Sequence, residues 1–341
     1  MTPLPLAILN TGLVTAVGLN TAAACAAIRA GVSNASETRF MDSAGEPLRG
    51  HRVPLEDEWL GTPRLVKMAT LAIEEALTGV PREQWRTIPL LLCTAEAGRH
   101  DRPNLDSILF EAITRELRAD FASGSATIPH GRVSVAIALE RARELIGAGR
   151  VTGVLVVAAD SLLNAAVLRT YEQAGRLLTA LNSDGFIPGE AAGAALVGTP
   201  AAGTSIRCVG LGFATETALL DSGVPLRAEG LSQAIRTALL EAGRGLHDVD
   251  VRITDLSGEQ YYFKEAALAL ARVLRVRREQ IDLWHPAECI GEVGAAAGIA
   301  VLAVARIALT KSYVPGPLVL AHFAGDDGRR AAALVERVGP Q

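Results

Sequence analysis

The sequence predicts an α/β protein, and three observations support this prediction. Residues 154–159 are wholly apolar, which is typical of a strand that is covered on both faces of a sheet. Strand-like and helix-like stretches alternate along the chain. The chain is rich in alanine and glycine, whereas aromatic residues make up only 4% of it. Because small residues allow close contact between helices and a sheet, we expect helices packed on a sheet and not a β-sandwich.

The first part of the chain contains strands and helices in alternation. An apolar strand at 6–14 leads to a helix that ends near residue 29, for which Thr21 is the expected N-cap. Apolar residues at helical spacing predict a helix over 63–77, and further helices are predicted at 100–113, where charged and apolar residues mix, and at 134–148. Further strands are predicted at 88–93, 154–159 and 194–197, and the second of these is expected to be a central parallel strand.

The second part repeats this order after a break of small residues and proline at 199–203. Strands are predicted at 205–212, 251–256, 317–323 and 331–338, and helices at 231–242, 263–273 and 295–309. The repeated order predicts a structural duplication, with halves at 1–200 and 201–341. Since no low-complexity linker separates the halves, we expect one compact unit.

Charge and composition exclude several classes of protein. The formal net charge of -4, with both signs interspersed, gives no basic field for nucleic acid. No apolar run reaches the ~20 residues of a membrane span, and no charged segment opens a signal peptide. The four cysteines (Cys25, Cys93, Cys208 and Cys289) lack paired spacing and suit buried positions in a reducing compartment. We therefore expect a cytoplasmic protein without metal or cofactor.

Two glycine-rich stretches, at 184–193 and 290–298, carry the strongest functional signal. They resemble two signature loops of the β-ketoacyl synthases, the condensing enzymes of the thiolase-like superfamily. Residues 13–18, 64–69 and 148–161 resemble the opening strand and turn, the early helix and the core strand of that family, in the same order. The resemblance covers nearly the whole chain, and it implies a thiolase-like fold with two duplicated halves and a five-layered αβαβα core.

The family's chemistry depends on three side chains and a loop. A cysteine at a strand-to-helix elbow attacks an acyl thioester, and the N-terminus of the helix lowers the pKa of its thiol. Two histidines assist decarboxylation. Backbone N–H groups, one of them from a Phe-containing loop near the C-terminus, form an oxyanion hole.

At the matching positions this chain has other residues. Arg132, Leu256 and Glu292 stand where the resemblance places the cysteine and the two histidines. Ala287 and Val301 replace a lysine and a glutamate that pair in the family. A guanidinium cannot act as a nucleophile. Loss of one member of a buried ion pair costs roughly 3–5 kcal/mol, whereas loss of both can be neutral. The joint replacement therefore indicates a catalytically degenerate member.

Two expectations concern contacts around the pocket in which the family's cysteine and histidines would lie. Arg132 and Glu292 replace residues that face each other in the family, so we expect them to form an ion pair there. Phe323 and Gly325 stand in suitable places for the gate and oxyanion loop. The following residues, Asp326 and Asp327, depart from the family by placing negative charge beside it.

A rebuilt active site is the alternative. Cys289 with His285 could form a thiolate–imidazole pair, and His130 with Glu190 or Glu292 could form an acid–base pair. The plainer interpretation is a buried cysteine and a structural histidine.

The expected function is a non-catalytic scaffold, partner subunit or accessory binding protein of fatty acid or polyketide biosynthesis. Chain-length factors, which lack the cysteine and pair with an active synthase, are the precedent within the resemblance. The alternative is a divergent acyltransferase of the 3-oxoacyl-[acyl-carrier-protein] synthase type, acting on acyl thioesters.

Expected partners are a second copy or a related synthase. The apolar run 154–158, with Leu162 and Leu163, is compatible with a two-fold dimer. An acyl carrier protein is a further candidate. Four arginines could meet its acidic surface or its phosphopantetheine, or could simply form a solvated helix face: Arg99, Arg102, Arg115 and Arg118.

Overall fold

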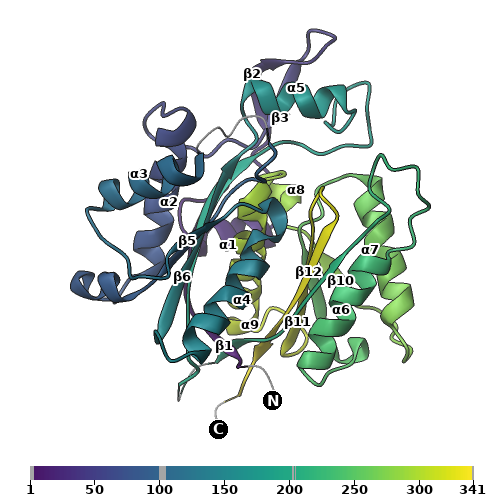
Figure 1. Ribbon diagram of the computed structural model, residues 1–341. Helices are drawn as coiled ribbons and strands as arrows, with labels where there is room; N and C mark the ends of the chain where they lie inside the picture. Colours follow the sequence, from purple (N-terminus) through teal and green to yellow (C-terminus); the bar gives the residue numbers. More distant parts are fainter. Residues whose placement is uncertain (1–3, 100–104, 202, 204, 340–341) are drawn as a thin grey trace.

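The computed structural model describes residues 4–99, 105–201, 203 and 205–339. Ten of its strands follow one hydrogen-bonded order, β10-β9-β11-β12-β8-β1-β7-β6-β4-β5. The two middle strands, β8 and β1, pair only through Leu6 with Cys208 and Ala7 with Arg207. The five strands on each side of this short junction therefore form two sheets that face each other, with helices between them and outside them (Figure 1).

The two sheets have the same strand order. The first contains β1 (Leu6–Val14), β4 (Leu90–Cys93), β5 (Ala126–Ile128), β6 (Gly153–Ser161) and β7 (Glu190–Gly198). The second contains β8 (Ile206–Thr215), β9 (Val251–Thr254), β10 (Asp282–Trp284), β11 (Leu318–Ala324) and β12 (Arg329–Arg337). From the edge inward, β5-β4-β6-β7-β1 corresponds to β10-β9-β11-β12-β8. We infer that the halves divide in the segment between β7 and β8.

The helices complete five layers. The middle layer contains α1 (Thr21–Arg29), α4 (Ser134–Gly147), α8 (Ala287–Ile290) and α9 (Ala297–Thr310). The outer layers contain α2 (Gly61–Ala76) and α3 (Leu105–Leu117) on one sheet, and α6 (Glu229–Glu241) and α7 (Gln260–Val273) on the other. Because α9 lies between the two sheets, nearly all of its sides are buried and apolar. The αβαβα core of duplicated halves is therefore confirmed.

The two halves also share their elbow geometry. In the first half, His130 (φ -125, ψ 20) and Gly131 (φ 55) open the turn η2 (Gly131–Val133) that leads into α4. In the second, Val293 (φ -114, ψ 19) and Gly294 (φ 55) open the turn η4 (Gly294–Ala296) that leads into α9. A φ near +55° favours glycine, so each half needs this residue where its chain turns into the central helix.

Several local predictions are wrong. Asn20, not Thr21, is the N-cap of α1: its Oδ1 accepts from Ala23 N at 2.8 Å, while the Thr21 hydroxyl donates to Thr11 O at 2.9 Å. The strand β6 is central and parallel to β4, as predicted, but it is antiparallel to its other neighbour, β7. Because β6 has a neighbouring strand on each side, the run 154–158 is not an edge strand that could pair with a second copy in a dimer. The outermost strand of that sheet is β5.

Other elements were not predicted. These are the hairpin of β2 (Ser36–Met41) and β3 (Pro47–Gly50), the helix α5 (Ala165–Gln173), and the short elements β5, β10 and α8. The helix predicted at 100–113 is present as α3, although its residues 100–104 lie outside the described ranges. Within the described ranges, none of the helices has the length and hydropathy needed to cross a membrane.

Candidate functional site

The elbow between β5 and α4 places Arg132 in the middle of the molecule. Gly131, with its positive φ, lets the chain turn there, and a Cβ at this position would lie 1.9 Å from Oε1 of Glu96. The turn directs the Arg132 side chain into the space between the halves, where the residue is only 5% exposed. Since a buried guanidinium needs anionic partners, its surroundings decide what this site can do.

Three carboxylates surround the Arg132 guanidinium. Its Nη2 donates to Oδ1 of Asp326 at 2.6 Å, its Nη1 lies 3.5 Å from Oε2 of Glu292, and its Nε lies 4.0 Å from Oδ2 of Asp255. The Cζ atom also lies 4.4 Å from the ring centroid of Tyr262. The expected contact between Arg132 and Glu292 is present, but the shortest ion pair is with Asp326.

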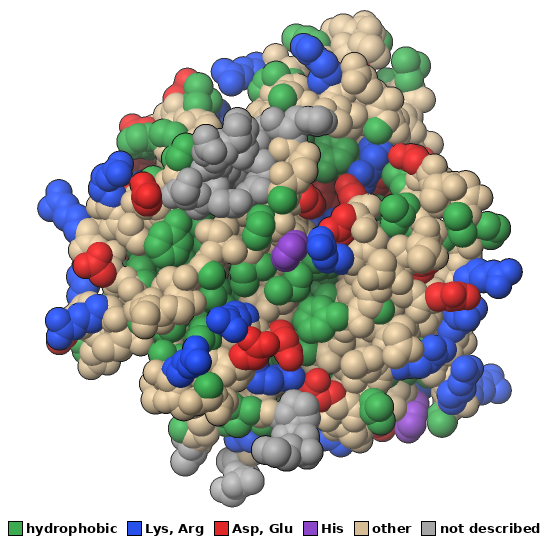
Figure 2. Space-filling view, viewed as in Figure 1, with side chains coloured by type: hydrophobic (Ala, Val, Ile, Leu, Met, Phe, Trp, Pro, Cys, Tyr) green, Lys and Arg blue, Asp and Glu red, His purple; other side chains and the backbone are tan. Residues whose placement is uncertain are grey.

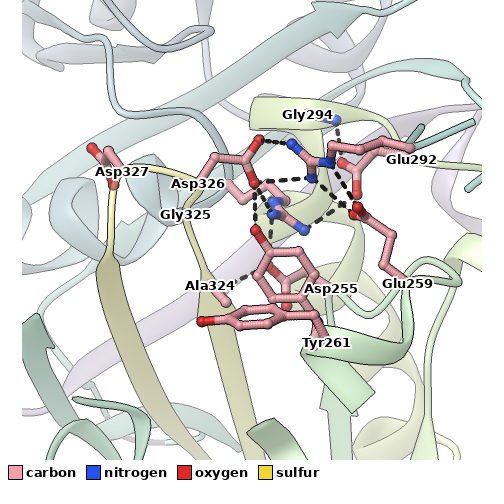
Figure 3. A network of polar contacts seen from close by, with 12 residues as sticks. Asp255, Glu259, Tyr261, Glu292, Gly294, Ala324, Gly325, Asp326 and Asp327 are labelled. Atoms are coloured by element: carbon pink, nitrogen blue, oxygen red, sulfur yellow. Dashed lines mark hydrogen bonds and ion pairs between the residues drawn. The ribbon is translucent and has the colours of Figure 1, made fainter. Parts of the chain in front are cut away.

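Asp326 links Arg132 to a second arginine. Arg176 Nη1 donates to its Oδ2 at 2.6 Å, and the Tyr262 hydroxyl donates to its Oδ1 at 2.5 Å. Arg176 also forms a bidentate pair with Glu259, at 2.6 and 2.9 Å. Figure 3 shows that the Asp326 carboxylate points into this group from the turn between β11 and β12. These ion pairs join segments from both halves. We call the six residues the ion cluster: Arg132, Arg176, Asp255, Glu259, Glu292 and Asp326.

The pKa values of three carboxylates, Glu292, Asp255 and Asp326, differ. Burial raises the pKa of Glu292 to about 7 and that of Asp255 to about 6, although Arg132 opposes both shifts. Burial would also raise the pKa of Asp326, but Arg132 and Arg176 outweigh it and hold this pKa well below its usual range. Asp326 is therefore the permanent counter-ion of the two arginines, whereas Glu292 and Asp255 can exchange a proton near neutral pH.

Carboxylates also occupy the second elbow. The backbone N–H of Gly294 donates to Oε1 of Glu292, and that of Ala295 donates to Oδ2 of Asp160, both at 2.9 Å. Asp160 in turn pairs with Arg99 at 2.5 Å. Free N–H groups at a helix start favour anions, and here the chain's own side chains satisfy them.

Little space remains inside the ion cluster. The cavity bounded by Arg132, Arg176, Glu292 and Asp326 has a volume of about 10 Å³. This is about the space that one water molecule needs. Outside it, an open depression of about 340 Å³ is lined by Arg176, Tyr262, Asp326 and the segment 219–222. The arrangement can bind polar groups at its mouth, whereas the space among the described side chains of the ion cluster holds no more than about one water molecule.

Comparison with known proteins identifies the architecture. No family model matches the sequence, and no curated protein does. Among solved structures, a chain of the AntDE:AntF complex, a type II polyketide ketosynthase with its acyl-carrier protein, superposes with a TM-score of 0.82. It is 18% identical, and the match covers 98% of this chain and 100% of that one. The chain has the thiolase-like fold of the ketosynthases.

Two further ketosynthase structures agree. The ishigamide ketosynthase/chain length factor matches with a TM-score of 0.79 at 17% identity, covering 99% of this chain and 100% of that one. The ketosynthase ApeO in complex with its chain length factor ApeC, from Xenorhabdus doucetiae, matches with a TM-score of 0.74 at 14% identity, covering 98% of each chain. The ketosynthase fold therefore extends over essentially the whole of the given sequence.

The other positions predicted from the ketosynthase resemblance are apolar. Leu256 follows β9, is 2% exposed and packs with Tyr262, Ala266 and Ala324. Ala287 and Val301 line a second internal cavity of about 10 Å³, which is distinct from the one among Arg132, Arg176 and Asp326 and also borders Asp255 and Glu292. None of the three apolar side chains can transfer a proton.

Phe323 and Gly325 lie where β11 ends. Phe323 is 3% exposed and packs in the core of the middle layer. The N–H of Gly325 donates to Arg329 O at 2.9 Å, and the N–H of Ala324 donates to Oδ2 of Asp255 at 2.9 Å. The backbone N–H groups of Ala324 and Gly325 are thus engaged within the protein.

The rival acid–base pair is not assembled. His130 is partly buried, and burial, followed by the charge of Arg329, lowers the pKa of its imidazole. The carboxylate of Glu190 is instead held by Arg64, whose Nε donates to it at 2.8 and 3.0 Å. The carboxylate of Glu292 contacts Arg132 and the backbone N–H of Gly294. Among the described contacts, His130 therefore pairs with neither Glu190 nor Glu292.

The rival thiol–imidazole pair is not assembled either. Cys289 is 3% exposed, and its Sγ lies 3.8 Å from the carbonyl oxygen of Ile28. Burial, followed by the charge of Glu288, raises the pKa of its thiol. His285 turns its Nδ1 toward Glu288 at 3.3 Å. Within the described chain, no group of His, Cys, Asp and Glu residues is arranged to hold a metal ion.

The four arginines considered for a carrier protein have different surroundings. Arg99 is used by Asp160, and Arg102 lies outside the described residues. Arg115 and Arg118 are exposed at the end of α3. Over the face seen in Figure 2, basic and acidic side chains are interspersed, without a broad basic field.

Proposed function

We propose that this chain is a non-condensing partner subunit of a ketosynthase. One observation carries the proposal: the elbow position that the resemblance assigns to a cysteine nucleophile holds Arg132, which is fixed by Asp326 at 2.6 Å and by two further carboxylates. A permanently charged guanidinium donates hydrogen bonds only and cannot attack a thioester.

The rest of the ion cluster supports the same proposal. Condensation requires a thiolate, donors for the developing negative charge and room for an acyl chain. Here the donors of the second elbow, Gly294 N and Ala295 N, bind carboxylates. The cavity of about 10 Å³ excludes a thioester from the interior. The site is built to hold two halves together, as buried ion pairs can fix a unique arrangement.

The proposed partner is a related ketosynthase, because two of the matched structures are a ketosynthase with its chain length factor. The edge strand β5 offers a surface for such pairing. It has one neighbouring strand, β4, so its outer edge is open to a strand of another chain. For the same reason, we propose that the chain takes part in polyketide or fatty acid biosynthesis.

A carrier protein is the second proposed partner, since one matched structure contains an acyl-carrier protein. The exposed Arg115 and Arg118 are the candidate contacts on this chain. Their replacement by glutamine should weaken carrier binding without altering the partner subunit.

Reconstitution tests the proposal. The chain is co-expressed with a ketosynthase that is encoded in the same genome and retains the cysteine and both histidines. Light scattering then measures the molar mass of the complex. We expect a one-to-one heterodimer and ketosynthase activity that depends on the chain. A chain that stays apart from every such ketosynthase would contradict the partner role.

The acyltransferase alternative has less support. It needs a reactive Cys289, His130 or Glu292. The Cys289 thiol is buried with a raised pKa, and His285 pairs with Glu288 instead. Glu292 has a pKa of about 7, which suits proton transfer, but Arg132 and Gly294 fill its hydrogen-bonding positions.

A further inference from the structure

A larger cavity lies away from the ion cluster and shares no lining residue with it. Its volume is about 250 Å³. Its walls come from α1, from β10 and α8 with the residues between them, from α9, and from Tyr313, which follows α9. It therefore lies where the first half meets the second, a common place for ligand sites.

Apart from Arg29, His285 and Glu288, the residues that line this cavity are uncharged, and most of them are apolar. Its apolar side chains are Ile28, Leu283, Trp284, Pro286, Val304, Ile307 and Ala308. Two thiols complete the lining, Cys25 at 5% and Cys289 at 3% exposure. Burial raises the pKa of Cys25 to about 12 and also raises that of Cys289, so both remain neutral. Such walls favour hydrocarbon over charged groups.

The rim provides one cation. Arg29, in the last turn of α1, places its Cζ 3.9 Å from the ring centroid of Tyr313. Among the residues that the structure describes, no carboxylate pairs with Arg29, although it is exposed. The acidic residue of the rim, Glu288, already lies 3.3 Å from Nδ1 of His285. The cation is pre-oriented by the tyrosine ring and remains available to an external anion.

We propose that this cavity binds a monocarboxylate with an apolar tail of about six to ten carbons. The tail lies against Trp284 and Cys289, and the carboxylate pairs with Arg29. An apolar cavity of about 150 Å³ accepts benzene, so one of 250 Å³ has room for a somewhat longer chain. A single guanidinium matches the charge and the planar shape of one carboxylate.

Titration calorimetry with sodium octanoate and the full chain tests this proposal, with octanamide as the uncharged analogue. We expect saturable one-to-one binding of octanoate, and binding of octanamide weaker by at least about tenfold. Tryptophan fluorescence gives a second readout, because Trp284 lines the cavity whereas Trp59 and Trp85 do not. The change on adding octanoate should disappear in Trp284→Phe.

Two substitutions locate the site. Arg29→Gln should lower octanoate affinity by at least about tenfold and leave octanamide affinity unchanged. The matched control is Arg39→Gln, which removes another exposed arginine that lies over an aromatic ring, 5.2 Å from the Phe40 centroid and outside the cavity. Ala308→Phe, which fills the cavity, should abolish binding of both compounds.

Absence of octanoate binding to the natural chain would overturn the proposal. So would equal binding by the natural chain and Arg29→Gln, because the carboxylate would then lie elsewhere. If Ala308→Phe fails to fold, Arg29→Gln still decides, since Arg29 is an exposed side chain whose loss leaves the core intact.

Discussion

Arg132 and Asp326 lie 194 positions apart in the sequence, yet the guanidinium of one donates to the carboxylate of the other at 2.6 Å. The contact joins the elbow of the first half to the β11–β12 turn of the second. Since Asp326 also binds Arg176, one carboxylate bridges the buried cation of Arg132 and the partly buried cation of Arg176. The middle of this ketosynthase fold is therefore held by charge, where a condensing enzyme needs an open pocket.

Removal of the central cation should be costly. Arg132→Ala leaves Asp326, Glu292 and Asp255 without their shared counter-ion, so we expect a loss of about 3–5 kcal/mol in the free energy of unfolding. The control is Arg141→Ala, whose pair with Glu144 is exposed at 48% and 56% and should contribute less than about 1 kcal/mol. Urea unfolding measures both, and equal losses would contradict a structural role for the ion cluster.

The stability should depend on pH through Glu292. Its folded pKa, about 7, lies above the ordinary value of 4.5, so the folded state binds the proton more tightly than the unfolded state. The stabilisation is therefore complete below pH 4.5 and declines as pH rises to about 7. Glu292→Gln removes this decline, and its stability relative to the natural chain should rise by up to about 3 kcal/mol over that window.

Other groups also titrate between pH 4.5 and 7, so the free energy of unfolding must be compared between variants at each pH. The lowered pKa of the buried His51, about 4, has the opposite effect, because stability is then lost as pH falls from 6.5. Glu144→Gln, at an exposed carboxylate, is the matched control. A constant difference between Glu292→Gln and the natural chain from pH 4.5 to 7 would rule out the raised pKa.

The elbow itself can be tested at Gly131. Gly131→Ala adds a Cβ 1.9 Å from Oε1 of Glu96 at a φ of 55°, so the substitution combines backbone strain with a clash. Gly149→Ala is the control, since its φ of 68° is similar and nothing lies within 4 Å of the added atom. We expect about 1 kcal/mol for the control and clearly more for Gly131. Thermal unfolding midpoints that fall equally would show that the elbow is not tightly packed.

The Cys289 thiol should be unreactive. Because burial raises its pKa and leaves the residue 3% exposed, alkylation by iodoacetamide at neutral pH should be slower than that of a free cysteine by at least about tenfold. Unfolding in urea should expose all four cysteines to labelling, which provides the internal reference. Rapid, selective labelling of Cys289 in the folded chain would revive the acyltransferase alternative.

The sequence predicts the architecture better than the ion cluster. Long buried strands such as β6 and the glycine turns at 131 and 294 carry local signals, so the layers and the duplication could be expected. The pair of Arg132 with Glu292 could also be expected, because the resemblance already places both positions in one pocket.

The partners of Asp326 could not be predicted in this way. Arg176 follows the unpredicted helix α5, and Tyr262 stands at the start of α7, with no local pattern that sets either apart from surface residues. Both residues contact Asp326 only because of how the two halves pack together, and a local sequence pattern does not encode that packing. The same holds for Arg330 and Glu265, both 1% exposed and 2.8 Å apart. Short edge strands such as β5 and β10 have three residues each, too few for a periodic signal.

Single-turnover condensation from malonyl- and acyl-thioesters by the purified chain tests the central claim most directly. Because Arg132 occupies the elbow and the cavity beside it has a volume of only about 10 Å³, we expect no carbon dioxide release and no β-ketoacyl product above the rate without protein. Product formed at the elbow, and lost in Arg132→Ala or Glu292→Ala, would contradict the account.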